Sequence, residues 1–161
     1  MDSNFKYQKR NTPAFTAATY FAFAAGLFLY GLGIFNAEWE LNVKGYYLLC
    51  MFLVVITSIV TQKVVRDNTE DRALQLENPK HRMRNTPAFT GMAIVGLVIG
   101  FAMFFIGLFN ASFELNVKGY YIAVMLLIAY SAIGVQKVTR DNAEDKLFME
   151  QTQGHNQNTQ A

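Results

Sequence analysis

Two sets of polar side chains in this sequence have the types and spacing to do chemistry. The first occurs twice, each time within nine residues, and combines amides, a carboxylate and a lysine: Asn36, Glu40, Asn42 and Lys44, then Asn110, Glu114, Asn116 and Lys118. Two carboxylates beside two lysines can be interpreted as a cation or small-anion site shared between the copies. Each carboxylate, however, has its own lysine one helical turn away, so the set is charge-balanced and needs no ligand. We therefore predict a structural clasp, with glutamate–lysine pairs within a copy or crossed between copies and with Asn42 and Asn116 capping the helices that follow.

The second set is basic and follows two apolar runs: Lys63, Arg66, Lys137 and Arg140. Each of these side chains lies four residues before an acidic one, as Lys63 lies before Asp67. On a helix, such pairs stabilise a solvated end by a few tenths of a kcal/mol each. The alternative is a clamp that holds anionic lipid headgroups. We favour the ion pairs and keep the lipid clamp as the alternative.

Other catalytic or binding constellations are missing from the sequence. There is no nucleophile–base set, no phosphate-binding loop, and no metal-ligand spacing around His81 or His155. No Asp, Glu, Lys, Arg or His lies inside the apolar runs, which argues against a proton-coupled carrier. The net charge of +2 and the lack of a basic run argue against nucleic acid. We predict no enzyme activity, no cofactor and no metal site.

The elements that position these residues are predicted from the spacing of the charges. Residues 11–37 and 85–113 form uncharged stretches of 27 and 29 residues, and residues 45–62 and 119–136 form two more of 18 each. A helix needs roughly 17–25 residues to cross the hydrocarbon core of a bilayer, and these segments lack the polar stripe of a soluble bundle. The sequence therefore predicts an all-α integral membrane protein with four helices, arranged as two tandem transmembrane hairpins.

The chain is an internal duplication. Shifting it by 74 residues aligns 10–71 with 84–145 without a gap, and 31 of the 62 positions are identical. Identical residues gather at the expected membrane edges, while the helix interiors differ, so the edges have the narrower requirement. Because each repeat has two spans, both copies enter from the same side, and we expect an axis along the membrane normal to relate them.

The repeated blocks also carry a family resemblance. Residues 35–47 read Phe-Asn-Ala-Glu-Trp-Glu-Leu-Asn-Val-Lys-Gly-Tyr-Tyr, and after one span residues 62–67 read Gln-Lys-Val-Val-Arg-Asp; both recur in the second repeat with few changes. This combination resembles the YiaA/YiaB family of bacterial inner-membrane proteins over roughly residues 10–145. The resemblance implies a two-helix repeat domain in the bacterial cytoplasmic membrane. It implies no established activity and no catalytic residues.

The predicted organisation follows the repeats: a cytoplasmic segment at 1–12, repeats at 13–71 and 87–145, a cytoplasmic linker at 72–86 and a flexible cytoplasmic tail at 146–161. Thr12-Pro13 and Thr86-Pro87 are typical helix starts. Of the 14 Lys and Arg residues, only Lys44 and Lys118 lie by the hairpin loops, and the other 12 lie on the side of the spans that carries the terminal segments and the linker. The positive-inside rule then places both chain ends in the cytoplasm.

Two further groups have a predicted structural role. Aromatic residues next to the hairpin loops predict a belt at one membrane interface: Trp39, Tyr46, Tyr47, Phe113, Tyr120 and Tyr121. Small residues at spacings of four and seven align between the repeats: Ala22, Gly26 and Gly33 with Gly96, Gly100 and Gly107. Small faces let membrane helices approach closely. We predict that the first helices of the repeats meet through this stripe or pack with it against their own return helices.

Three function classes remain. The favoured one is a non-enzymatic membrane protein that acts through helix packing, oligomerisation, or binding of a partner or lipid. The others are a passive pore or uncoupled carrier formed on oligomerisation, and a lipid-organising or envelope-stress accessory protein that uses the basic cytoplasmic edge. The candidate partners are the bilayer, anionic lipid at the cytoplasmic edge and a second copy of the chain.

Overall fold

The computed structural model describes residues 9–159, with side chains through 152, and these residues form four helices. They are α1 (Pro13–Asn36), α2 (Leu41–Glu77), α3 (Pro87–Asn110) and α4 (Leu115–Thr159). Each helix is long and apolar enough to cross a membrane. The predicted all-α, four-helix membrane architecture is confirmed.

Local sequence explains where α1 and α3 begin. The hydroxyl of Thr12 accepts a hydrogen bond from the Phe15 amide, and that of Thr86 accepts one from the Phe89 amide, both at 3.2 Å. A proline occupies the first turn of both helices, where its missing N–H leaves no intrahelical hydrogen bond unmade. Both predicted starts are therefore confirmed.

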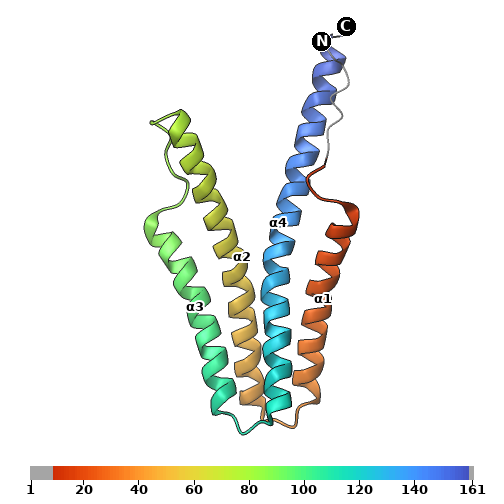
Figure 1. The fold of residues 1–161 in the computed structure, drawn as a ribbon, viewed down its shortest axis with the longest axis vertical. Coiled ribbons are helices and arrows are strands. Elements are labelled where there is room, and N and C mark those ends of the chain that lie inside the picture. The colour runs from red at the N-terminus through yellow and green to blue at the C-terminus, as the bar shows by residue number, and fades with distance from the viewer. Residues whose placement is uncertain (1–8, 160–161) are drawn as a thin grey trace.

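The helices lie in a row in the order α3, α2, α4, α1 (Figure 1). Consequently α1 packs along α4 and α3 packs along α2, whereas α1 touches its own return helix at only a few positions. Each first helix thus packs against the return helix of the other repeat. The connection 37–40, whose two ends Ala37 and Glu40 are extended, joins α1 to α2 although α4 lies between them in this order.

The small-residue stripe lies in these exchanged contacts. A Cβ atom added at Gly26 would lie 2.8 Å from Ile128 of α4, and one added at Gly100 would lie 3.1 Å from Val54 of α2. The stripe therefore packs against return helices, but against those of the opposite repeat. Of the two predicted arrangements, the meeting of α1 with α3 is wrong, and packing against the return helices is formed with the partners exchanged between the repeats.

Leucine at Gly26 or Gly100 is expected to destabilise the fold by about 1–3 kcal/mol, because the added side chain overpacks a closed contact. Gly31 is the matched control, since a Cβ there meets nothing within 4 Å. The measurement is thermal unfolding of the detergent-solubilised variants. Equal tolerance of leucine at positions 26, 31 and 100 would contradict the packing described above.

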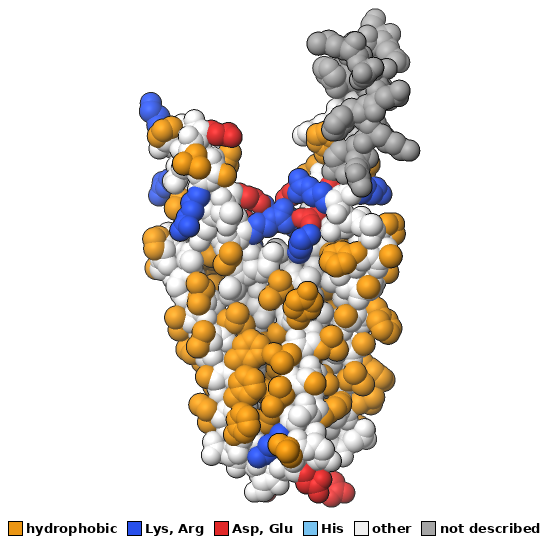
Figure 2. Space-filling view, viewed as in Figure 1, with side chains coloured by type: hydrophobic (Ala, Val, Ile, Leu, Met, Phe, Trp, Pro, Cys, Tyr) orange, Lys and Arg blue, Asp and Glu red, His pale blue; other side chains and the backbone are white. Residues whose placement is uncertain are grey.

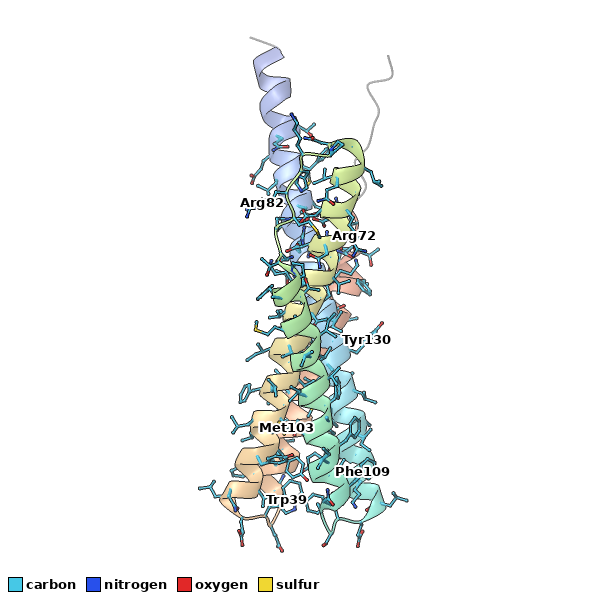
Figure 3. The ribbon with its side chains drawn as sticks, turned by 90° about the vertical axis from the view of Figure 1, so that its left-hand side faces the viewer. Trp39, Arg72, Arg82, Met103, Phe109 and Tyr130 are labelled. Carbon is cyan, nitrogen blue, oxygen red and sulfur yellow. The ribbon has the colours of Figure 1, made fainter. Side chains whose placement is uncertain are left out.

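Apolar side chains cover the middle of the molecule, and charged ones lie at its two ends, most of them at the end that carries the chain termini (Figure 2). Tyr130 and Phe109 point outward from this band, whereas Arg72 and Arg82 project from the chain beyond it (Figure 3). The end that carries residues 9–12 and the 78–86 linker is called the charged end, and the opposite one the loop end. The exposed apolar band matches a surface in contact with lipid.

The return helices continue well past their apolar runs. α2 reaches Glu77, so the linker is shorter than the predicted 72–86. α4 continues to Thr159, which differs from the predicted flexible tail at 146–161; residues 160–161 lie outside the described part of the chain. Helix-forming residues 146–152 contain no Gly or Pro, and Lys146 and Glu150 stand one turn apart with 3.9 Å between their charged atoms.

Candidate functional site

The charged end holds a cluster of six basic and six acidic side chains, which we call the charge cluster. It comprises Arg10, Lys63, Arg66, Arg84, Lys137 and Arg140 with Asp67, Glu70, Asp71, Asp141, Glu144 and Asp145. The residues come from the chain segments before α1 and α3 and from the parts of α2 and α4 beyond the apolar runs. The six positive and six negative charges of the cluster balance.

The predicted one-turn pairs form within each return helix. Lys63 and Lys137 each donate to the aspartate four residues on, Asp67 and Asp141, at 2.7 Å. Arg66 and Arg140 likewise reach Glu70 and Glu144 at 2.9 and 2.8 Å. These contacts are the local pairs that the spacing predicts.

The arginines also make crossed pairs between the repeats. Arg66 on α2 donates to Asp141 on α4 at 2.8 Å, and Arg140 on α4 donates to Asp67 on α2 at the same distance. The third guanidinium nitrogen of Arg140, Nη2, donates to Glu70. Because a planar guanidinium has five N–H donors, one side chain can serve its own helix and the neighbouring one at once. The charge cluster therefore links the two repeats.

The segment before each first helix is tied to the same cluster. The backbone amide of Arg84 donates to Asp71 at 2.7 Å and its side chain adds a second bond at 2.9 Å; in the other repeat, the amide of Arg10 donates to Asp145 at 3.1 Å. His81 also contacts the fully buried Asp71, at 3.1 Å, so it is not simply solvated as an isolated histidine would be. The repeated Arg-Asn-Thr-Pro and Arg-Asp-Asn blocks bind each other here.

The cluster perturbs the ionisation of its carboxyl groups, which lie beyond the apolar spans. Burial alone raises the pKa of Asp141, but hydrogen bonds from Lys137, Arg66 and Asn11 outweigh it and lower the pKa to about 2. The pKa of Asp67 is lowered too, because bonds from Lys63 and Arg140 offset its burial. Both groups therefore remain ionised at neutral pH.

Acid is expected to weaken the fold at this end. A carboxyl whose pKa is lowered by folding stabilises the protein fully above its ordinary pKa of about 3.9, and this contribution is lost as the pH falls toward the folded value. Thermal stability in detergent should be flat from about pH 8 to 5 and fall between about pH 4 and 2. Asp141→Asn should lower stability at pH 7 and flatten the acid limb. An acid limb that is as steep in this variant would contradict the assignment to the cluster.

Aromatic residues dominate the loop end. Trp39 and Phe113 occupy equivalent positions of the two repeats and stack with ring centroids 4.4 Å apart. Tyr47 and Tyr121, another equivalent pair, are both buried and stack at 6.3 Å. The predicted interfacial belt is therefore wrong for these two tyrosines, which pack inside the molecule where the repeats meet.

The neighbouring tyrosines connect opposite repeats. The hydroxyl of Tyr120 donates to the carbonyl of Leu29 at 2.6 Å, and its ring lies over Gly33. Tyr46 makes the equivalent bond to Met103 and lies over Gly107. These glycine–tyrosine contacts explain why both residue types are identical in the two repeats.

The predicted glutamate–lysine clasp is not formed at the loop end. Among the described residues, Glu40 and Glu114 make no ion pair; the ammonium groups of Lys44 and Lys118 bind instead the carbonyls of Phe35 and Phe109, at 3.2 and 3.3 Å. These carbonyls belong to the last turn of α1 and α3, where a cation satisfies free C=O groups. The crossed pairs that the sequence predicts here occur at the opposite end of the molecule.

The asparagines of the loops also differ from their predicted roles. Residue Glu40, not Asn42, precedes the first turn of α2, and Asn42 and Asn116 instead accept from the amides of the next residues. Asn110 donates to the carbonyl of Ile106 at 2.8 Å, whereas Asn36 is exposed. The side chains of Asn42, Asn110 and Asn116 therefore satisfy local backbone groups.

The structure thus defines a polytopic membrane protein whose two repeats are joined by a balanced charge cluster at one end and an aromatic cluster at the other. The sequence pattern of the family described as the yiaA/B two helix domain matches the chain twice, at residues 15–67 and 89–141. The chain belongs to this family.

Two relatives place the chain among bacterial membrane proteins. It is 32% identical to the inner membrane protein YiaA of Escherichia coli over 130 residues, which cover 81% of this chain and 82% of the relative. It is 51% identical to the uncharacterized membrane protein YubF of Bacillus subtilis over 78 residues, or 48% of this chain and 90% of the relative. No solved structure matches the chain.

Sequence reasoning missed the roles of Arg10, Arg84 and His81. A signal for the arginines was present: Arg10 and Arg84 head the repeated blocks, and Asp71 and Asp145 end them. When residues at both ends of a repeat stay identical while its interior diverges, those residues are candidates for contact with each other. For His81 no such signal exists, because it lies before the second copy of the aligned segment, and residue 7, at the same offset before the first copy, is a tyrosine.

Proposed function

We propose that this protein is a non-enzymatic component of the bacterial cytoplasmic membrane that acts by binding lipid or a partner at its charged end. The main support for this proposal is that charged side chains of both repeats are gathered into one cluster next to the apolar spans. The described residues contain no group of three or more His, Cys, Asp and Glu side chains that could hold a metal ion. A preassembled end of fixed shape, without a reactive constellation among these residues, is suited to recognition.

The proposal places the charged end in the cytoplasm. Its support is the positive-inside rule, applied to the Lys and Arg residues of the terminal segments and the linker. A reporter active only in the cytoplasm should function when fused at Pro79 or after Ala161. A reporter active only in the periplasm should function at Ser112, on the loop end. The reverse pattern would contradict the orientation.

Reconstitution separates this function from a passive pore. Proteoliposomes made over a range of protein-to-lipid ratios should release potassium and a small anionic dye no faster than empty liposomes do. In parallel, the protein purified in mild detergent from its native membrane should be enriched in anionic lipid about twofold or more over the bulk extract. Release that rises with protein content would reject the binding function in favour of a pore formed on oligomerisation.

A further inference from the structure

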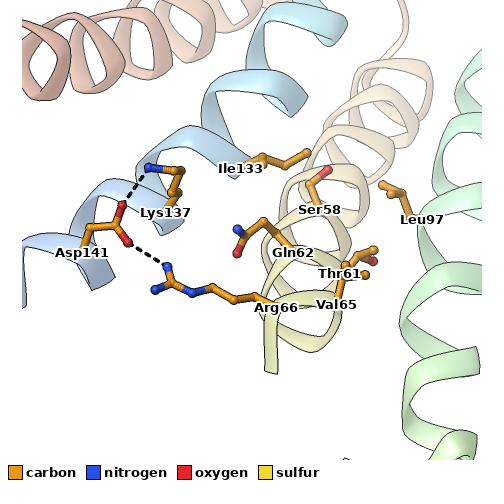
Figure 4. A pocket seen from close by; sticks show the side chains of 9 residues that line it. All are labelled: Ser58, Thr61, Gln62, Val65, Arg66, Leu97, Ile133, Lys137 and Asp141. Carbon is orange, nitrogen blue, oxygen red and sulfur yellow. Dashed lines mark hydrogen bonds and ion pairs between the residues drawn. The ribbon is translucent and has the colours of Figure 1, made fainter. Parts of the chain in front are cut away.

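A cavity of about 480 Å³ lies between α2, α3 and α4, where the apolar spans meet the charge cluster (Figure 4). Six of its lining residues are polar or charged: Ser58, Thr61, Gln62 and Arg66 from α2, with Lys137 and Asp141 from α4. The other three are apolar, and each comes from a different helix: Val65, Leu97 and Ile133. The cavity therefore offers both polar and apolar groups to one occupant.

The polar residues of the lining include hydrogen-bonding groups without a partner. Ser58 is 1% exposed, and its hydroxyl has no hydrogen-bond partner. The side-chain oxygen of Gln62, one helical turn away, is buried and unpartnered as well. A hydroxyl on a helix normally bonds to the preceding turn, as that of Ser131 does with Leu127. Because an unpaired buried polar group is costly, a ligand that bonds to it is stabilised.

Lys137 is the cation of the lining that remains available to an anion. Arg66 and Lys137 contribute two positive charges and Asp141 one negative charge whose oxygens are bonded to both cations, but Arg66 is also paired with Glu70 and Glu144. The Lys137 side chain is about half exposed, and its ammonium group has three N–H donors, of which contacts to Asp141 and Asn11 occupy two. It therefore retains a donor for an incoming oxygen anion.

We propose that this cavity binds the phosphate headgroup of an anionic phospholipid, with Lys137 and Arg66 facing the phosphate, the Ser58 hydroxyl donating to a glycerol ester oxygen, and the side-chain oxygen of Gln62 accepting from a hydroxyl of the headgroup. The apolar residues of the lining accommodate the start of an acyl chain, which is why a lipid fits better than free phosphate. This inference rests on the proposed binding function and names its ligand. It differs from a clamp made by all four basic side chains, because Lys63 and Arg140 do not line this cavity.

The duplication supplies the comparison residues for this site. The positions equivalent to Ser58 and Thr61 in the second repeat are Ala132 and Val135, which carry no hydroxyl. The hydroxyl-bearing residues of the lining therefore belong to one side of the pseudo-twofold axis. The expected stoichiometry is one tightly bound anionic lipid per chain.

The test is a titration of the full-length protein in mild detergent with a short-chain phosphatidylglycerol, followed by native mass spectrometry. Lys137→Gln should weaken binding about tenfold, as should the double variant Ser58→Ala/Thr61→Val. The matched controls, Lys63→Gln and Ser131→Ala, should change it less than about twofold. Lys63 is a fair control because it makes the same 2.7 Å pair and has a similar exposure.

Several outcomes would overturn the site. Equal weakening by Lys63→Gln and Lys137→Gln would place the lipid outside the cavity, and equal affinity for short-chain phosphatidylcholine would show that the headgroup charge is not read. Competition by inorganic phosphate at similar concentration would identify free phosphate as the ligand. If the double variant fails to fold, the two lysine variants still decide. If the cavity variants still enrich anionic lipid from the native membrane as the parent protein does, this site is rejected and the proposed function is kept. Release from proteoliposomes that rises with protein content would reject the function itself.

Discussion

Neither repeat is expected to persist as a folded monomeric hairpin when it is produced alone. Residues 1–78 contain α1 and α2, which touch each other at only a few positions, while the main partners of both helices lie in residues 79–161. Without those partners, Gly26 and Val54 lose the contacts that bury them. In lipid, helix association depends on such packing, so a lone hairpin lacks most of its stabilisation.

Produced together, the two halves should associate and co-purify in equal amounts. The cut between Asn78 and Pro79 falls in the linker, outside any helix, and leaves the crossed contacts of the charge cluster intact. The measurement is native mass spectrometry after affinity purification through a tag on one half only. A Gly26→Leu substitution in the first half should reduce recovery of the second, while Gly31→Leu should not.

Because the repeats are alike, a lone half has one other route to stability, which is to pair with a second copy of itself. That outcome agrees with the exchanged packing, since a homodimer of halves can reproduce the contacts of α1 with α4. The outcome that contradicts it is a monomeric half with full helix content and a cooperative thermal transition. In that case the hairpin would be an independent folding unit.

The sequence predicts the helices well because their signals are local. Apolar length predicts the spans, Thr12-Pro13 and Thr86-Pro87 predict two helix starts, and four-residue charge spacing predicts the pairs within α2 and α4. Each of these signals depends on residues within one or two helical turns. Tertiary partners do not enter, so a single sequence suffices.

The choice of helix partner is not a local property. The return helices share Glu-Leu-Asn-Val-Lys-Gly-Tyr-Tyr at their starts and Arg-Asp-Asn near the charged end, so these shared blocks do not indicate which return helix α1 packs against. The partner is seen only in three dimensions, where α1 packs along α4 and Trp39 stacks on Phe113 of the other repeat.

The same degeneracy explains the misplaced clasp. Glu40 with Lys44 and Arg66 with Glu70 have the same spacing, yet only the second pair forms an ion bridge. Lys44 lies beside the free carbonyls at the end of α1 and bonds to Phe35 there. The choice between a carboxylate and a carbonyl depends on where the preceding helix ends relative to the lysine, which spacing does not encode.

Loss of Arg140 is expected to be the most damaging single change at the charged end. Its guanidinium contacts Asp67 and Glu70 of the other repeat and Glu144 of its own helix. Asp67 is 3% exposed, so removal of this partner leaves a buried carboxylate with less compensation. Breaking a buried pair from one side costs about 3–5 kcal/mol; because Lys63 still bonds to Asp67, we expect about 2–4 kcal/mol for Arg140→Met.

The control for this change is Lys146→Met, which removes a cation of the same helix from an exposed pair with Glu150. Such pairs contribute about 0–1 kcal/mol, so the two variants should differ clearly in unfolding free energy in detergent. A double-mutant cycle of Arg140→Met with Asp67→Asn isolates the crossed contact, and we expect a coupling of about 1–3 kcal/mol. A coupling near zero, together with similar losses for Arg140→Met and Lys146→Met, would mean that the repeats are held together by the aromatic and glycine contacts alone. A large coupling would show that the charge cluster joins the two repeats, because Asp67 and Arg140 meet only when α2 of the first repeat lies beside α4 of the second.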